Sequence, residues 1–123
     1  MCGIYAALYS RKQHAALRKH YKGFATLRHR GPDCSRFEQS ARTAIGFHRL
    51  RVNGINRDAD QPFVGNGITC VCNGEIYNYT SLCNAHGLTC KTGSDCEVVL
   101  QLYIKMCVHE GCAFRDLVDE LDG

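Results

Sequence analysis

The sequence opens with Met1-Cys2-Gly3-Ile4, and a cysteine in second position can become an N-terminal nucleophile. Cysteine is small enough for the initiator methionine to be trimmed, which would leave one residue with both a thiol and a free α-amine. An α-amine titrates at about 7.7–8.0, so at neutral pH part of it is an unprotonated base beside the sulfur. Cys2 also fits a purely structural role in a buried strand. On these four residues alone, the structural role is favoured.

Two other positions have residue types that bind negative charge. Arg49 lies at the end of an expected strand, where a guanidinium can bind a carboxylate through two parallel hydrogen bonds. A surface salt bridge explains this arginine equally well. Asn73-Gly74 can direct a side-chain amide and a backbone N–H towards one point, as an oxyanion hole requires. The ordinary interpretation of the same pair is a tight hairpin turn.

The apolar pattern predicts the elements that would position these residues. We expect β-strands at residues 2–9, 43–50, 67–72 and 88–91, and helices at 12–28, 76–86, 97–106 and 114–121. Arg28-His29-Arg30-Gly31-Pro32-Asp33 should be an ordinary helix-to-strand loop, and an irregular polar segment should run through Asn53-Gly54. Ser94 and Glu97 match a capping box, which places Asp95 in the first turn of a helix.

The composition is that of a soluble globular protein of one domain, with 123 residues, 45% hydrophobic and 22% charged. No apolar run has transmembrane length and no signal peptide is visible, so we expect a cytosolic protein without a membrane partner. Eleven of the fifteen Lys and Arg lie between Arg11 and Arg51, but no nucleic-acid-binding motif accompanies them. We therefore expect no nucleic-acid partner.

The nine cysteines include no C-x-x-C pair. Structural zinc sites usually have such paired spacing, so we expect no metal and interpret most of these cysteines as small buried hydrophobes. A cysteine-rich metal module is the alternative interpretation, and it rests on the cysteine count alone.

Six short motifs occur along the chain in a fixed order. They are Met-Cys-Gly-Ile at 1–4, Arg-His-Arg-Gly-Pro-Asp at 28–33, His-Arg-Leu at 48–50, Gln-Pro at 61–62, Asn-Gly-Glu-Ile-Tyr-Asn at 73–78 and Thr-Gly-Ser-Asp-Cys-Glu at 92–97. Together they resemble the N-terminal class II (N-terminal-nucleophile) glutamine amidotransferase domain of glutamine-hydrolysing asparagine synthetases. The resemblance extends over the whole chain. Each motif is weak by itself, and six in this order are not expected by chance.

The resemblance implies an α+β fold, an N-terminal-nucleophile-hydrolase-like αββα sandwich of antiparallel sheets flanked by helices. Because the chain ends at Leu121-Asp122-Gly123, we expect residues 1–123 to be the N-terminal portion of that domain, truncated at its C-terminus. No Ser-Gly-Gly-x-Asp-Ser loop is present. We therefore expect no cofactor in this chain, with ATP and magnesium confined to an absent synthetase domain.

The resemblance also assigns roles. Cys2 would attack the side-chain amide of glutamine with its α-amine as proton acceptor, and Asn73 and Gly74 would hold the oxyanion. Substrate binding would involve Arg49 for the α-carboxylate, Glu75 and Asp95 for the α-ammonium, and Val52 in the loop after Arg-Leu. A γ-glutamyl thioester would form, ammonia would leave for a synthetase domain or partner chain, and water would release glutamate.

The sequence departs from the family pattern in two ways, and the second departure motivates an alternative. Family members often have a small polar residue after the Arg-Leu pair, whereas Arg51 stands here. Further strands of the amidotransferase sandwich are also missing from the sequence. The alternative is a truncated, non-catalytic remnant that binds glutamine or a synthetase partner without turnover.

Overall fold

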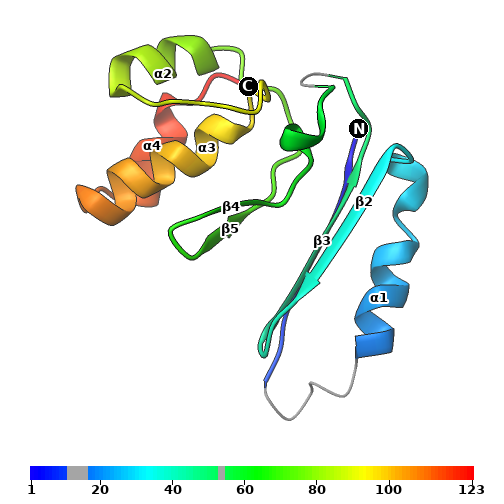
Figure 1. The fold of residues 1–123 in the computed structure, drawn as a ribbon. Helices are drawn as coiled ribbons and strands as arrows, with labels where there is room; N and C mark the ends of the chain where they lie inside the picture. The colour runs from blue at the N-terminus through cyan, green and yellow to red at the C-terminus, as the bar shows by residue number, and fades with distance from the viewer. Residues whose placement is uncertain (11–16, 53–54) are drawn as a thin grey trace. The chain divides into compact units, whose positions relative to one another are not determined.

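The computed structural model describes residues 1–10, 17–52 and 55–123. These residues form two compact units (Figure 1). Unit 1 comprises residues 1–51 and 60–62, and unit 2 comprises residues 52–59 and 63–123. Helices and antiparallel sheets both occur, which confirms the expected α+β class. The expected helical residues 12–16 and the expected irregular pair Asn53-Gly54 lie outside the described residues.

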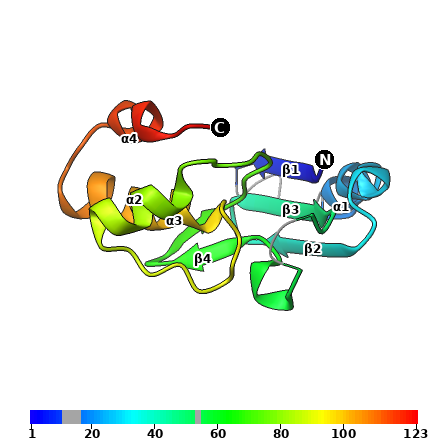
Figure 2. The same cartoon turned by 90° about the horizontal axis from the view of Figure 1, so that it is seen from above.

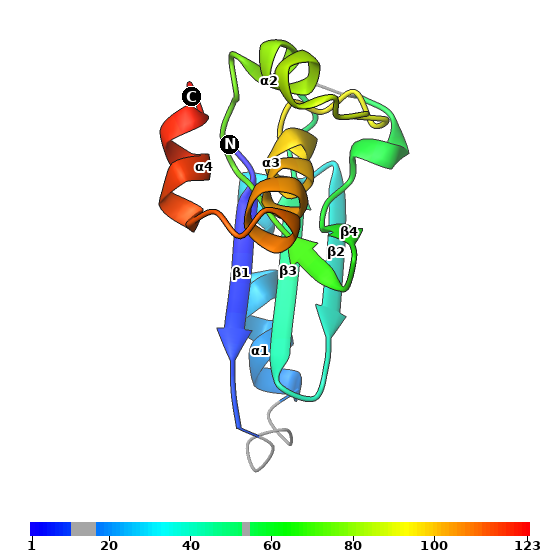
Figure 3. The ribbon, with the colours of Figure 1, turned by 90° about the vertical axis from the view of Figure 1, so that its left-hand side faces the viewer.

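Unit 1 contains an antiparallel sheet of three strands in the order β1-β3-β2 (Figure 3). The strands are β1 (Gly3–Leu8), β2 (Cys34–Gln39) and β3 (Thr43–Arg49), with Gly3 opposite His48 and Cys34 opposite Arg49. The expected strands 2–9 and 43–50 are confirmed as β1 and β3. β2 was not predicted, because its sequence Cys-Ser-Arg-Phe-Glu-Gln is mostly polar, as suits an edge strand with exposed side chains.

Helix α1 (Leu17–Ala25) lies along one face of this sheet (Figures 1 and 2). Its Phe24 is 3% exposed and stacks on the imidazole of His48, with ring centroids 3.8 Å apart. The same ring lies directly over Gly46 of β3, where an added Cβ would overlap it. Gly46 is therefore the residue that allows the helix to approach the sheet closely.

Unit 2 begins its regular structure with a hairpin of β4 (Phe63–Gly65) and β5 (Ile68–Cys70). Asn66 and Gly67 form the turn with φ angles of 49° and 74°, which is the geometry that an Asn-Gly hairpin favours. Asn73-Gly74, by contrast, lies in an irregular segment after β5. The hairpin interpretation of Asn73-Gly74 is therefore wrong, and the hairpin turn forms at the preceding Asn-Gly pair, Asn66-Gly67.

The helices of unit 2 are the short 3-10 helix η3 (Arg57–Ala59), α2 (Tyr79–His86), α3 (Glu97–Leu102), its π-helical continuation η4 (Tyr103–His109) and α4 (Phe114–Glu120). The last four pack together. They share a core of buried apolar side chains, namely Ile76, Leu82, Val98, Leu102, Met106 and Leu117. The expected strand at 88–91 is wrong, because this segment is irregular. Its last backbone N–H, at Lys91, donates to the Glu97 carboxylate instead of to a neighbouring strand.

Within the described residues, none of the helices has both the length and the apolar character needed to cross a membrane. The same part of the chain contains no group of three His, Cys, Asp or Glu side chains arranged to hold a metal ion.

Candidate active site

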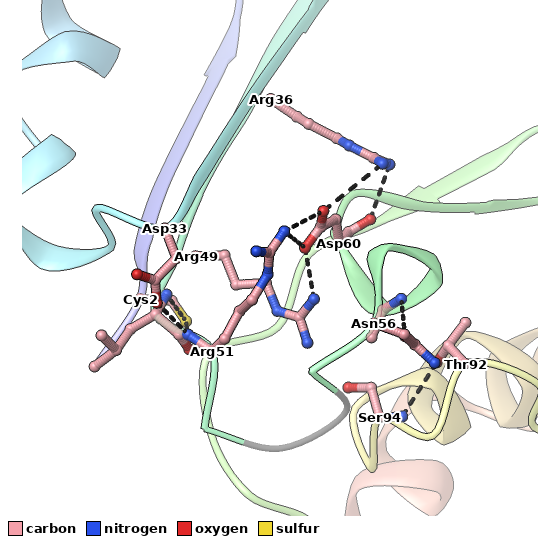
Figure 4. Close-up of polar contacts among 11 residues, drawn as sticks. Cys2, Asp33, Arg36, Arg49, Arg51, Asn56, Asp60, Thr92 and Ser94 are labelled. Carbon is pink, nitrogen blue, oxygen red and sulfur yellow. Dashed lines mark hydrogen bonds and ion pairs between the residues drawn. The ribbon is translucent and has the colours of Figure 1, made fainter.

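Cys2 lies immediately before β1, beside the end of the neighbouring strand β3 (Figure 4). The backbone N–H of Leu50 donates to the Cys2 sulfur, with an N···S distance of 3.4 Å. The Arg30 Nε donates to the Cys2 carbonyl at 3.0 Å. Cys2 is thus held both at its sulfur and at its backbone, next to the residue that follows Arg49.

The Arg-His-Arg-Gly-Pro-Asp segment, expected to be a loop, begins with the 3-10 helix η2 (Arg28–Arg30) and connects the strand ends around Cys2. Its Gly31 packs on the backbone of His48 so closely that any Cβ would overlap the His48 carbonyl. The Asp33 N–H donates to the Arg49 carbonyl at 3.0 Å, and the Asp33 carboxylate accepts the Arg51 N–H at 2.8 Å. This loop is therefore more than an ordinary connection, because it fixes the backbone on both sides of Leu50.

Arg49 forms a buried ion pair with Asp60. The Arg49 Nη1 lies 2.5 Å from the Asp60 Oδ1, and the two residues are 5% and 4% exposed. The Arg51 Nη2 lies 3.1 Å from the Asp60 Oδ2, and the Arg36 Nη1 donates to the Asp60 carbonyl at 3.0 Å (Figure 4). Arg49 does form a salt bridge, as the structural interpretation proposed, but the salt bridge is buried and not on the surface.

The environment of Asp60 keeps this carboxyl group ionised. Burial raises the Asp60 pKa, but hydrogen bonds from Arg49 and Arg51 outweigh burial and lower the pKa below its usual value of 3.8. Burial, followed by the contact with Asp60, raises the pKa of the nearby Cys34 thiol. A permanent negative charge on Asp60 therefore fixes the Arg49 guanidinium.

Asp60 was missed by sequence reasoning because it lies in an irregular segment without any periodic pattern. The charge composition of unit 1 could nevertheless have indicated Asp60. Unit 1 has eleven basic residues but only three acidic ones, so few carboxylates are available to pair with a buried arginine.

In unit 2, the predicted residues 73–75 lie on the exposed irregular segment after β5. This segment is held at two points. The Cys96 thiol donates to the Gly74 carbonyl at 3.3 Å, and the Ile76 N–H donates to the Asp95 carboxylate at 2.7 Å. Asn73, Gly74 and Glu75 are therefore positioned by the chain that leads into α3.

The capping-box interpretation of Ser94 and Glu97 is wrong. Helix α3 begins at Glu97 without a side-chain cap, and Asp95 lies before the helix. The Glu97 carboxylate instead accepts the N–H groups of Lys91 and Thr92, at 2.9 Å and 2.8 Å, and the Thr92 hydroxyl at 2.8 Å. Glu97 thus organises the loop that carries Asp95. A carboxylate has up to four acceptor positions, so the bond from Ile76 leaves the Asp95 side chain capacity for a further donor.

The predicted site residues divide between the two units. Unit 1 contains Cys2 and Arg49, and unit 2 contains Val52, Asn73, Gly74, Glu75 and Asp95. The pair in unit 1 lies at one end of one sheet. In unit 2, residues 73–75 and Asp95 are joined through Ile76, whereas Val52 is 65% exposed.

The sequence matches the family described as "Glutamine amidotransferase domain" over residues 1–115. The chain belongs to this family. The match confirms the resemblance drawn from the six motifs and includes every predicted site residue of this amidotransferase domain.

Curated relatives of this amidotransferase domain have names that agree with one another. A "Probable asparagine synthetase [glutamine-hydrolyzing]" of Dictyostelium discoideum is 41% identical over 84% of this chain and 20% of its own length. "Asparagine synthetase B [glutamine-hydrolyzing]" of Escherichia coli (strain K12) is 38% identical over 84% of this chain and 19% of its own. "Asparagine synthetase [glutamine-hydrolyzing] 1" of Arabidopsis thaliana is 38% identical over 100% of this chain and 20% of its own length. The chain spans about a fifth of the length of these relatives.

Proposed function

We propose that this amidotransferase domain hydrolyses the side-chain amide of glutamine to glutamate and ammonia, with Cys2 as the nucleophile. The observation that carries the proposal is the position of Cys2. Its sulfur lies 3.4 Å from the backbone nitrogen of Leu50, directly after Arg49. A nucleophile and a cation suited to the substrate's carboxylate thus stand at the same end of one sheet.

The reaction follows from the chemistry of an N-terminal cysteine. After removal of Met1, the α-amine of Cys2 accepts the thiol proton while the sulfur attacks the amide carbon. The side chain of Asn73 and the N–H of Gly74 stabilise the oxyanion. The tetrahedral intermediate collapses to a γ-glutamyl thioester as ammonia leaves with the transferred proton. Water then hydrolyses the thioester and releases glutamate.

Substrate recognition uses charges of opposite sign at the two ends of the amino-acid group. Arg49 binds the α-carboxylate, and Asp60 holds the Arg49 guanidinium in a fixed orientation through their buried ion pair. Glu75 and Asp95 bind the α-ammonium. Asp95 suits this role because it is a buried carboxylate, 8% exposed, in a loop braced by Glu97.

The ammonia is proposed to serve asparagine formation from aspartate in a synthetase domain or partner chain. The names of the relatives support this step, since each contains the words asparagine synthetase and glutamine-hydrolyzing. The test is asparagine formation by the chain mixed with an ammonia-dependent synthetase domain, ATP and aspartate. Glutamine should replace added ammonia only when this chain is present. Equal asparagine formation from glutamine without it would contradict the step.

Glutamate release from glutamine tests the hydrolytic role directly. Protein with Met1 removed should release glutamate, and Cys2→Ala should lower the rate by at least about a thousandfold, because no other group replaces the covalent nucleophile. Cys112→Ala is the matched control, since this partly buried cysteine belongs to unit 2 outside the predicted site, and its rate should equal that of the unchanged protein. Saturable glutamine binding without glutamate release would contradict the catalytic proposal and favour a binding module.

A further inference from the structure

Unit 2 contains a pair of thiols in direct contact. The sulfur atoms of Cys83 and Cys90 are 3.1 Å apart, and the chain reverses its direction between the two residues. Cys83 lies on α2, and Cys90 lies in the irregular segment that follows this helix.

The end of α2 brings the two thiols together. Gly87 has a φ angle of 61°, in the left-handed region, and its N–H donates to the Asn84 carbonyl at 3.4 Å. The Leu88 N–H donates to the Cys83 carbonyl at 2.8 Å. These two bonds form a Schellman motif, which reverses the chain over the last turn of the helix. The backbone turn therefore brings Cys83 and Cys90 side by side.

The surroundings of the two thiols are mostly apolar. Both are partly buried against the apolar core that includes Leu82 and Leu102. Burial, followed by the contact with Cys83, raises the pKa of Cys90 to about 12. Within the contact either sulfur can be the donor, and the raised pKa favours the protonated form of Cys90. The 3.1 Å distance between the two sulfurs places each thiol within reach of a disulfide formed on the other.

We propose that Cys83 and Cys90 form an intrachain disulfide by exchange with a low-molecular-weight disulfide such as oxidised glutathione. One cysteine of the pair, as its thiolate, attacks one sulfur of the oxidant, which breaks the oxidant's S–S bond and releases one thiol carrying that cysteine's proton. The other cysteine then loses its proton and attacks the protein sulfur of the mixed disulfide. The Cys83–Cys90 bond forms and the second thiol of the oxidant leaves. The two cysteines lose two electrons, and the oxidant gains two.

The disulfide would act on the loop that follows it. Cys90 immediately precedes Lys91 and Thr92, whose N–H groups are held by Glu97. The bond would fasten the entry of this loop to α2 in addition to the existing hydrogen bonds. Its formation does not depend on glutamine hydrolysis, so the two proposals fail independently.

Mass spectrometry of one peptide tests the proposal. Trypsin and a glutamate-specific protease release residues 76–91, which contain Cys83 and Cys90 and no other cysteine. The folded protein is equilibrated with mixtures of reduced and oxidised glutathione, and accessible thiols are then alkylated. We expect residues 76–91 to be recovered without alkylation and two hydrogen masses lighter than the reduced peptide. Recovery with both cysteines alkylated, or bonded to other cysteines, would overturn the proposal.

A comparison with the unfolded protein tests whether the fold causes the pairing. The equilibrium constant for the Cys83–Cys90 bond should be at least roughly tenfold larger in the folded protein than in concentrated urea, because the fold holds the two sulfurs together. Equal constants would overturn the structural argument. Cys83→Ser should leave Cys90 alkylated, whereas Cys112→Ser, the matched control, should leave the disulfide intact. Loss of the bond in both variants would also count against the proposal.

Discussion

The two units of the molecule use buried carboxylates in opposite ways. In unit 1, Asp60 accepts from the guanidinium groups of Arg49 and Arg51, so a side chain positions other side chains. In unit 2, Asp95 and Glu97 accept from backbone N–H groups, so side chains position loops. The two units also differ in charge. Unit 1 has eleven basic and three acidic residues, whereas unit 2 has four basic and nine acidic residues.

The difference reflects which group needs a fixed position in each unit, a side chain in unit 1 and the backbone in unit 2. Arg49 already stands on a regular strand, and only its long side chain needs a partner to fix its direction. The irregular segments of unit 2 have no strand or helix of their own, so carboxylates accept their backbone N–H groups at Ile76, Lys91 and Thr92. On a regular strand, a carboxylate is needed to hold a side chain. In an irregular segment, a carboxylate is needed to hold the backbone itself.

The largest expected effect is the loss of the carboxylate in unit 1. Asp60→Asn leaves the buried Arg49 without its countercharge and should lower the free energy of unfolding by about 3–5 kcal/mol. Urea denaturation measures this change, and amide hydrogen exchange should rise in β1, β2 and β3. Asp58→Asn is the matched control, because Asp58 is exposed, and it should change stability by less than about 0.5 kcal/mol. Equal effects of the two variants would remove Asp60 from its assigned role.

The second effect concerns the carboxylate in unit 2. Glu97→Gln replaces an acceptor of three hydrogen bonds with a weaker neutral one and should cost about 1–3 kcal/mol. Faster amide exchange should be confined to unit 2, at Lys91 and Thr92. The exposed Glu110 provides the control variant Glu110→Gln. Exchange that rises equally in β1–β3 would contradict the separate roles of the two carboxylates.

The pH dependence of stability sharpens the first prediction. Because the Asp60 pKa is lowered on folding, its ionisation stabilises the folded protein above the usual value of 3.8. That contribution should be lost as the pH falls below 3.8 through the folded pKa. The difference in unfolding free energy between the unchanged protein and Asp60→Asn should therefore be constant near neutral pH and shrink in acid. A difference that grows as the pH falls would have the wrong sign for a lowered pKa.

The smallest effect tests the hairpin that leads into residues 73–75. Gly67 has a φ angle of 74°, so Gly67→Ala should cost about 1 kcal/mol through backbone strain. Asn66→Gly keeps a residue that accepts positive φ and serves as the control, with a smaller change. Thermal unfolding of both variants measures the difference. A neutral Gly67→Ala would show that the turn relaxes at no cost.

The parts of the fold that could be predicted are those with a local signal. β1 and β3 are apolar runs, and α3, which lies within the helix expected at residues 97–106, buries its apolar residues Val98 and Leu102. β2 lacked this signal because an edge strand tolerates polar residues on its exposed positions. The expected strand at 88–91 failed because its backbone found the Glu97 carboxylate instead of a neighbouring strand.

The sequence predicted the residue types of the candidate site, but it did not predict the residues that hold them in position. Cys2 and Arg49 stand out by position and chemistry, and the family match includes both. Asp60 holds Arg49 from 11 positions away, and Glu97 holds Thr92 from 5 positions away. No sequence period encodes such contacts. The same holds for Arg30, which reaches the Cys2 carbonyl across 28 positions.

The central claim is that Cys2 becomes acylated by glutamine. Protein with Met1 removed is mixed with glutamine, quenched in acid and digested with trypsin, which releases residues 2–11 with Cys2 as their only cysteine. We predict a transient γ-glutamyl group on this peptide and on no other cysteine-containing peptide, absent from Cys2→Ala. Glutamate release at an unchanged rate from Cys2→Ala, with no acylated Cys2 in the unchanged protein, would contradict the account.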